Sequence, residues 1–178
     1  TVAITGSNGK TTVKEMLSSI LSLKASTLAT AGNFNNDIGV PLTLLRLEEH
    51  HQYAVIELGA NHPGEIGYTT NLTKPDVAIL NNVSAAHVEG FGSVHGVARA
   101  KTEIFRGLGC QGVAITPLES EYSSSWESVC DNYRWQTFGL LEEADVYATD
   151  ITLNEEGQPT FKLHVNGEAE TVTLQLSG

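Results

Sequence analysis

The stretch Thr5–Thr12, which reads T-G-S-N-G-K-T-T, constrains the fold more than any other part of the chain. It follows the apolar run Val2–Ile4 and precedes an amphipathic segment, which is typical of a turn between a strand and a helix. Gly6 and Gly9 let successive backbone N–H groups point inward, and the positive end of the helix dipole adds to the same place. The order of strand, glycine-rich turn and helix predicts a phosphate-binding loop.

The side chains that follow the turn fit the same chemistry. Lys10 would reach the outer phosphates of a nucleotide, and the hydroxyl of Thr11 or Thr12 would ligate a phosphate-bound Mg²⁺. The general pattern G-x-x-x-x-G-K-[ST] requires a glycine where this chain has Ile4, so the loop is the shorter G-x-x-G-K-T. A tight turn with a solvated lysine is the alternative, and the strand before and helix after the loop favour the phosphate site.

Apolar runs and amphipathic segments alternate through the first 144 residues, as expected for an α/β fold with a doubly wound, mostly parallel sheet and helices on both faces. The Asn-rich stretch 32–41 is expected to be an irregular loop. The expected strands are 2–4, 26–30, 53–56, 76–80, 113–116 and 135–139, and the expected helices are 11–23, 64–72, 94–108 and 120–132. In the first helix we expect Val13, Met16, Leu17, Ile20 and Leu21 to face the sheet, and Lys14, Glu15, Ser18 and Ser22 to lie on the other side.

Beyond residue 145 the pattern changes to strict alternation, broken by the turns N-E-E-G and V-N-G-E. Alternation with such turns predicts antiparallel hairpins. We therefore expect a single domain over residues 1–178, with a phosphate-loop α/β core over 1–144 and a small antiparallel sheet over 145–178. The chain has no initiating methionine and stops just after an apolar run, so we also expect a fragment of a longer protein.

Composition excludes some functional classes. A net charge of -11 with only ten Lys and Arg residues argues against a nucleic-acid surface, which needs clustered cations. No apolar run approaches the length of a membrane span. The two cysteines, Cys110 and Cys130, lack metal-site spacing, and no secretory signal is present, so we expect a cytoplasmic protein.

Polar residues follow the apolar strands where an open parallel sheet gathers its ligands. Glu57 ends the run 53–56, Asn81 and Asn82 end the run 76–80, and His87 follows a little later. A carboxylate at the end of a buried strand needs a cation, and Mg²⁺ at the phosphate loop would supply one. The alternatives are a helix cap or a lysine pair for Glu57, and a structural role for His87, because Mg²⁺ prefers oxygen ligands.

Lys101 falls on the inward stripe of its predicted helix. Its ammonium must therefore reach out to water or lose its charge. A neutral amine can react with carbon dioxide to give a carbamate, which is an anionic metal ligand. From the residues alone we favour the ammonium that reaches water. The apolar neighbours on this stripe are Val97, Ala100, Ile104, Phe105 and Leu108.

Four longer stretches resemble the Mur ligases of peptidoglycan synthesis. They are T-G-S-N-G-K-T-T-V-K-E-M, A-G-N-F-N-N-D-I-G-V-P-L-T-L-L-R-L, Y-A-V-I-E-L-G-A-N-H-P-G-E-I, and N-N-V-S-A-A-H-V-E-G-F-G-S with A-K-T-E-I-F after it. Together they cover the chain from Thr1 to about Phe105, with weaker resemblance through the hairpins. The phosphate loop marks only the wider family, which includes folylpolyglutamate synthases. The motif E-L-G-A-N-H and the Asn-rich loop are most similar to the member that adds D-Ala-D-Ala to UDP-MurNAc-tripeptide.

The resemblance implies an ATP- and Mg²⁺-dependent amide ligase that works through an acyl phosphate, with UDP-MurNAc-tripeptide and D-Ala-D-Ala as substrates of the parent and a monomeric state. It implies that Lys10 binds phosphate, that Thr11 ligates one Mg²⁺, that Glu57 and His87 ligate a second, and that Lys101 is carbamylated. Lys10, Lys101 and His87 are then the catalytic candidates. It leaves open whether Asn33, Asn35 or Asn36 contacts ligand. The predicted ATP-binding residues are Gly6, Ser7, Asn8, Gly9, Lys10, Thr11, Thr12, Asn33 and Asn36.

The family's adenosine-holding segment and its N- and C-terminal domains are not found in this sequence, so we expect weak Mg-ATP binding and no ligation from these residues alone. Two rival functions are a GTPase-like switch and a small-molecule kinase. The stretch Thr73–Asp76, T-K-P-D, resembles a guanine-reading motif, but it precedes its strand and so belongs at the edge opposite the phosphates. A kinase would phosphorylate its substrate without needing an amine.

Overall fold

The computed structural model describes residues 1–85 and 88–176. Within these residues the strands form one nine-stranded sheet in the order β2-β3-β1-β4-β5-β6-β7-β8-β9. The strands are β1 Val2–Thr5, β2 Thr27–Ala29, β3 Tyr53–Glu57, β4 Val77–Leu80, β5 Val113–Pro117, β6 Arg134–Gly139, β7 Val146–Leu153, β8 Pro159–Val165 and β9 Glu168–Thr173. All pairs from β2 to β7 are parallel, which confirms the predicted parallel core.

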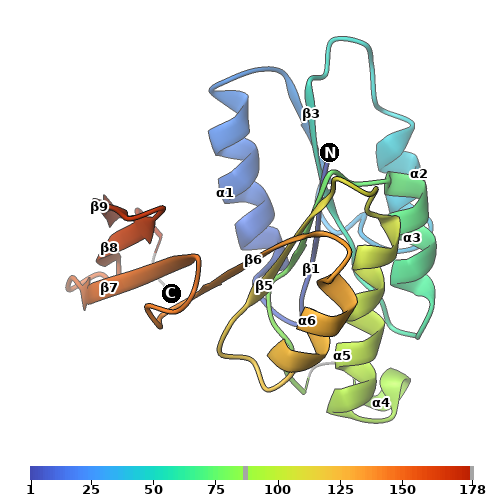
Figure 1. The fold of residues 1–178 in the computed structure, drawn as a ribbon. Helices are drawn as coiled ribbons and strands as arrows, with labels where there is room; N and C mark the ends of the chain where they lie inside the picture. The colour runs from blue at the N-terminus through green and yellow to red at the C-terminus, as the bar shows by residue number, and fades with distance from the viewer. Residues whose placement is uncertain (86–87, 177–178) are drawn as a thin grey trace.

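Helices cover both faces of the parallel part, as a doubly wound fold requires. In Figure 1, α1 lies on one side of the sheet, and α2, α3, α5 and α6 lie on the other. The helices are α1 Lys10–Ser22, α2 Gly39–Leu44, α3 Glu65–Thr73, α4 Val88–Phe91, α5 Val94–Thr102, the 3₁₀ helix η1 Glu103–Gly107, and α6 Ser123–Cys130. In the described part of the chain, no helix is long and apolar enough to span a membrane.

The predicted hairpins are present at the C-terminal end. β7 pairs with β8 and β8 with β9, both antiparallel, and Figure 1 shows these strands beyond the helix-covered part of the sheet. They do not form a separate sheet, because β6 and β7 pair in parallel through Phe138↔Val146 and Gly139↔Tyr147. The antiparallel strands therefore extend the main sheet at its β6 edge.

The helix α2 was not predicted. The sequence of residues 32–41 predicts an irregular loop, yet α2 begins at Gly39 within it. The Asn36 side-chain oxygen accepts the Gly39 N–H at 2.7 Å, and Pro41 lies in the first turn, where its missing N–H costs no hydrogen bond. The predicted helix 94–108 is also different, because it changes from α to 3₁₀ geometry at Glu103.

The predicted inward face of α1 needs correction. The buried residue of this helix is Lys14, which we had placed on the outer side, whereas Ile20 is 58% exposed. The other predicted apolar residues of this face are half-buried. Lys14 points inward because its ammonium donates a hydrogen bond to the backbone carbonyl of Thr30, which directly follows β2. On the other side of the sheet, the predicted inward stripe of the helix 94–108 is confirmed. Its apolar residues are all buried, namely Val97, Ala100, Ile104, Phe105 and Leu108.

The register of the central strands brings the predicted site residues to one edge. β1 lies between β3 and β4, with Ile4 opposite Glu57 and Thr5 opposite Leu80. The carboxyl ends of these three strands therefore meet beside the loop that follows β1. This is the edge where an open α/β sheet binds its ligands.

Candidate functional site

The loop from Gly6 to Gly9 connects β1 to α1 and has the geometry that its glycines allow. Gly9 has φ of +71°, a left-handed conformation that L side chains rarely adopt, and it directly precedes the first helical residue. A Cβ on Gly6 would lie 2.9 Å from the Asn81 Cβ, so this position needs a residue without a side chain. The loop therefore combines the tight backbone turn and the helix N-terminus of a phosphate site.

Lys10 folds back over this loop. Its Nζ donates to the carbonyl oxygens of Gly6 at 2.9 Å and Ser7 at 3.4 Å. Burial lowers its pKa, and the negative charge of Glu57 opposes that shift. The ammonium therefore lies at the loop, where a bound phosphate would offer it charged oxygens in place of the carbonyls.

The segment after β4 holds the loop in place. Asn8 N–H donates to Asn82 Oδ1 at 2.9 Å, and the side-chain amides of Asn81 and Asn82 donate to the Asn8 carbonyl at 2.9 and 3.0 Å. Ser84 N–H donates to Ser7 Oγ at 2.9 Å. The prediction that Asn81 and Asn82 lie at this edge is correct, and in the structure they hold the loop. Ser84 was missed, and its position after the two asparagines was the signal that could have identified it.

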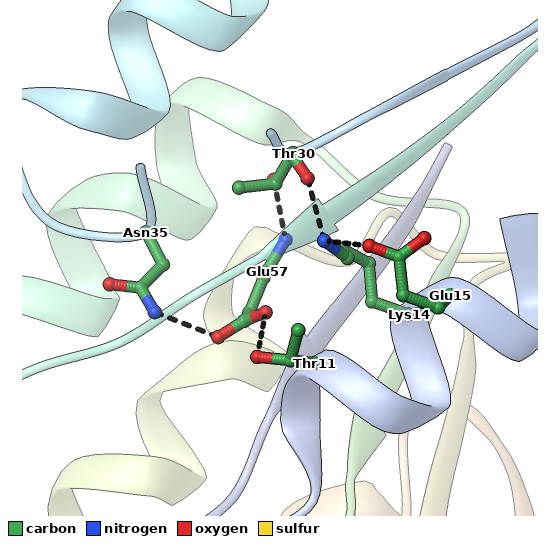
Figure 2. Close-up of polar contacts among 6 residues, drawn as sticks. All are labelled: Thr11, Lys14, Glu15, Thr30, Asn35 and Glu57. Carbon is green, nitrogen blue, oxygen red and sulfur yellow. Dashed lines mark hydrogen bonds and ion pairs between the residues drawn. The ribbon is translucent and has the colours of Figure 1, made fainter. Parts of the chain in front are cut away.

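Glu57 is the acidic centre of the site. Its side chain is 1% exposed, at the end of β3. One carboxylate oxygen accepts the Thr11 hydroxyl at 3.0 Å, and the other accepts the Asn35 side-chain amide at 2.7 Å, as Figure 2 shows. The structure thus joins two of the four residues that we predicted to ligate Mg²⁺, although they lie 46 residues apart. A carboxylate beside a hydroxyl is an oxygen donor set that fits Mg²⁺.

The asparagine-rich loop contributes Asn35 to this centre. The loop is fixed by Gly59 N–H, which donates to the Asn35 carbonyl at 2.7 Å. Of the two asparagines predicted to bind ATP, Asn36 caps α2 through its side-chain oxygen, and Asn33 is exposed. Asn35, which the sequence left as one of three choices, is the asparagine that contacts Glu57.

Lys101 lies in α5 and is only 3% exposed, which counts against the alternative in which its ammonium reaches open water. Burial, and secondarily the positive charge of Lys10, lower the pKa of Lys101 to about 8. The charges of Lys10 and Lys101 therefore affect each other, although their elements are far apart in sequence. Lys10, Glu57 and Lys101 therefore form one group of charges at the phosphate loop.

The remaining predicted residues are placed as follows. Thr12 is exposed in the first turn of α1, next to the loop. His87 lies outside the described residues, and its metal and catalytic roles stay predictions. Within residues 1–85 and 88–176 there is no group of three or more His, Cys, Asp and Glu that could hold a metal ion. At the phosphate loop, the Glu57 carboxylate and the Thr11 hydroxyl are the oxygen donors that lie together.

The stretch considered as a guanine reader lies away from this group. The Asp76 N–H donates to the Thr1 carbonyl at 2.9 Å, and Lys74 has φ of +45° at the end of α3. Both residues precede β4, at the amino ends of strands whose carboxyl ends carry the phosphate loop. The structure therefore supports the positional argument against a GTPase-like switch.

Comparison with known proteins gives a consistent result. The family model described as Mur ligase middle domain matches residues 4–178. The UDP-N-acetylmuramoyl-tripeptide–D-alanyl-D-alanine ligase of Escherichia coli K12 is 50% identical over 178 residues, which cover 99% of this chain and 39% of that protein. A crystal structure of MurF from Acinetobacter baumannii has a TM-score of 0.95 at 46% identity and covers 99% of this chain and 38% of its own.

The MurF ligase of Thermotoga maritima, whose crystal structure is a complex with ADP, has a TM-score of 0.86 at 33% identity over 99% of this chain and 40% of its own. The chain thus spans about two fifths of the length of these relatives. The family match covers the phosphate loop, the Glu57 centre and the hairpins alike. The chain therefore belongs to the Mur ligase middle domain family.

Proposed function

We propose that this chain is the ATP-binding part of a ligase that joins D-alanyl-D-alanine to UDP-N-acetylmuramoyl-tripeptide. The observation that carries the proposal is the meeting of Thr11 and Glu57 beside Lys10 at the phosphate loop. The 50% identical relative from E. coli supports the substrates, and the relative crystallised with ADP supports the nucleotide. In this reading residues 1–144 are the phosphate-loop core, residues 145–178 are its antiparallel extension, and the relatives' additional length supplies the other domains of a monomeric, cytoplasmic enzyme.

The chemistry follows from the poor reactivity of a carboxylate toward an amine. A peptide carboxylate oxygen attacks the γ-phosphorus of ATP, and the bond from that phosphorus to the β-phosphate oxygen breaks to release ADP. The amine of D-Ala-D-Ala then attacks the acyl carbon, loses a proton, and expels inorganic phosphate. Phosphorylation thus converts an oxide leaving group into phosphate, which leaves far more readily.

Each residue of the site has a task in this scheme. The loop amides and Lys10 bind the transferred phosphate and stabilise the charge that develops on it. Thr11 and Glu57 supply the oxygens that would hold Mg²⁺, with His87 and a carbamylated Lys101 as the further proposed ligands. The metal would neutralise phosphate charge during transfer. Asn35 orients the Glu57 carboxylate by donating to its second oxygen.

The test uses the full-length enzyme with ATP, UDP-MurNAc-tripeptide and D-Ala-D-Ala, and measures phosphate release and product mass. Release should require both the carboxylate and the amine. With ¹⁸O in the terminal peptide carboxylate, one labelled oxygen should appear in the released phosphate, because it is transferred with the acyl phosphate. Glu57→Gln should lose activity, since a neutral amide binds Mg²⁺ poorly. A stable phosphorylated product that forms without amine would instead assign a kinase.

A further inference from the structure

Lys14 is a buried lysine with no part in the scheme above. It lies on α1, one turn after Lys10, and its side chain is 1% exposed. Its Nζ donates to the Thr30 carbonyl at 2.8 Å and lies 2.7 Å from the carboxylate of Glu15, which is largely exposed. Removing an ammonium from water is costly unless it is paired and hydrogen-bonded. The hydrogen bond to the Thr30 carbonyl and the contact with Glu15 therefore compensate for the burial of this ammonium.

This contact changes how β2 and β3 end. In a parallel ladder, a residue that donates its N–H to one residue of the next strand accepts at its carbonyl the N–H two residues further along that strand. Thr30 N–H donates to the Val55 carbonyl at 3.0 Å, so the regular partner of the Thr30 carbonyl would be Glu57 N–H. Instead Glu57 N–H donates to the Thr30 hydroxyl at 2.9 Å, and the carbonyl accepts Lys14. The hydroxyl of Thr30 thus replaces its own carbonyl in the ladder.

The replacement of the Thr30 carbonyl by the Thr30 hydroxyl in the ladder sets the path of the chain after β2. With its carbonyl turned to Lys14, the backbone leaves the sheet at Thr30, and the following loop returns Asn35 to within 2.7 Å of a Glu57 carboxylate oxygen. The other carboxylate oxygen accepts Thr11, which belongs to the same helix as Lys14. Figure 2 shows these contacts around Glu57, in which Thr11 and Lys14 both belong to α1.

We propose that Lys14 is a positioning residue for Glu57: by holding the Thr30 carbonyl out of the ladder, it fixes both the Glu57 backbone and the loop that brings Asn35 to its carboxylate. The importance of this for catalysis rests on the proposed function, but the structural effect does not. The contacts of the Lys14 ammonium are with the Thr30 carbonyl and the Glu15 carboxylate, and it is not among the residues proposed to bind substrate or metal. It acts through Thr30 on the carboxylate that is the proposed metal ligand.

The first experiment compares crystal structures of the nucleotide-free full-length enzyme and its Lys14→Met variant. Methionine has a similar length but can neither donate a hydrogen bond nor carry charge. The expected result is that Glu57 N–H moves to the freed Thr30 carbonyl, which extends the ladder by one bond, and that Asn35 withdraws from the Glu57 carboxylate. A variant in which Thr30, Asn35 and Glu57 keep their contacts overturns the proposal.

A second variant keeps the proposal open to refutation if Lys14→Met does not fold. Thr30→Val removes the hydroxyl while it leaves the carbonyl for Lys14, so Glu57 N–H loses its partner but the charge contact survives. Its crystal structure should show a displaced Glu57 backbone with the Lys14 contact intact. An unmoved Glu57 would count against the proposal.

The solution experiment measures Mn²⁺ affinity by electron paramagnetic resonance in the presence of ADP, together with kcat and thermal stability. Lys14→Met should weaken Mn²⁺ binding and lower kcat by about 10- to 100-fold, the usual effect of losing a partner that orients a metal ligand. The matched control is Lys24→Met at an exposed lysine just after α1, which should change neither. The variant could instead lose thermal stability while its Mn²⁺ affinity and kcat stay within about twofold of those of the unmodified enzyme. That result would show that Lys14 contributes to stability alone and would refute its role in positioning Glu57. If the unmodified enzyme does not ligate, the proposed function fails, whereas the crystal structures still decide the role of Lys14.

Discussion

Carbamylation of Lys101 gives the sharpest prediction for this site. Burial and the neighbouring Lys10 lower the pKa of Lys101 from 10.5 to about 8. At pH 7.5 the neutral fraction of the amine then rises from about 0.1% to roughly a quarter, a gain of a few hundredfold in the form that reacts with carbon dioxide. The amine nitrogen bonds to the carbon of CO₂ and releases a proton to water, so that an anion replaces the cation that Lys101 would otherwise carry near Lys10.

The perturbation is replacement of Lys101 in the full-length enzyme. Lys101→Ala should lower activity on the order of a hundredfold or more, because outer partners of metal ligands alone are worth about 10- to 100-fold. Formate or acetate in the buffer should restore part of that loss by placing an anion in the vacated space. Lys101→Arg keeps the positive charge and should stay inactive. In the unmodified enzyme, equilibration with ¹³C-bicarbonate should give a carbamate signal in carbon NMR that Lys101→Ala lacks.

The pH dependence separates the carbamate from an ordinary ammonium. At a fixed concentration of dissolved CO₂, the neutral amine increases as pH rises through about 8, so carbamylation and activity should rise through that range. An ammonium that held phosphate would lose its charge over the same range, and activity would fall. The carbamate reasoning is refuted by a fall in activity through pH 8, by an active arginine variant, or by activity that is indifferent to the removal of CO₂.

Three further predictions concern the loop and its supports. Lys10→Ala should lower kcat by on the order of a hundredfold, the usual effect of losing one preorganised charged donor. The circular dichroism spectrum should not change, because the contacts of Lys10 are confined to the loop. A decrease of only a few-fold in kcat would exclude the role assigned to Lys10. Asn82→Ala should weaken ATP binding roughly tenfold, the value of about one net hydrogen bond, measured by calorimetry; unchanged affinity would mean that the loop keeps its shape without Asn82. The Glu103 carboxylate accepts hydrogen bonds from the N–H groups of Gly64 and Gly67 at the start of α3. Glu103→Gln should therefore lower the free energy of unfolding, measured by urea titration, by about 1–3 kcal/mol. An unchanged free energy of unfolding would contradict this prediction.

Features that depend on neighbouring residues could be predicted from the amino-acid sequence alone. The phosphate loop could be identified because two glycines, a lysine and a threonine follow one another between a strand and a helix. The hairpins followed from alternation and turn residues, and the burial of Lys101 followed from helical spacing in α5. The family resemblance added the chemistry, because its motifs occupy these same stretches. All of these signals are local in the chain.

Which distant residues share the site, and what each of them contacts, depends on how the strands and loops pack in three dimensions. Thr11 meets Glu57 because the strand order places β3 beside β1, and the loop after β2 brings Asn35, rather than Asn33 or Asn36, to that carboxylate. Lys14 was assigned to the outer face of α1, since helical periodicity treats a lysine as solvent-facing. It is buried because the Thr30 carbonyl, sixteen residues away, offers a hydrogen bond that no local pattern records. Periodicity reports which face of an element is apolar, whereas a polar partner across the fold exists only once the sheet has assembled.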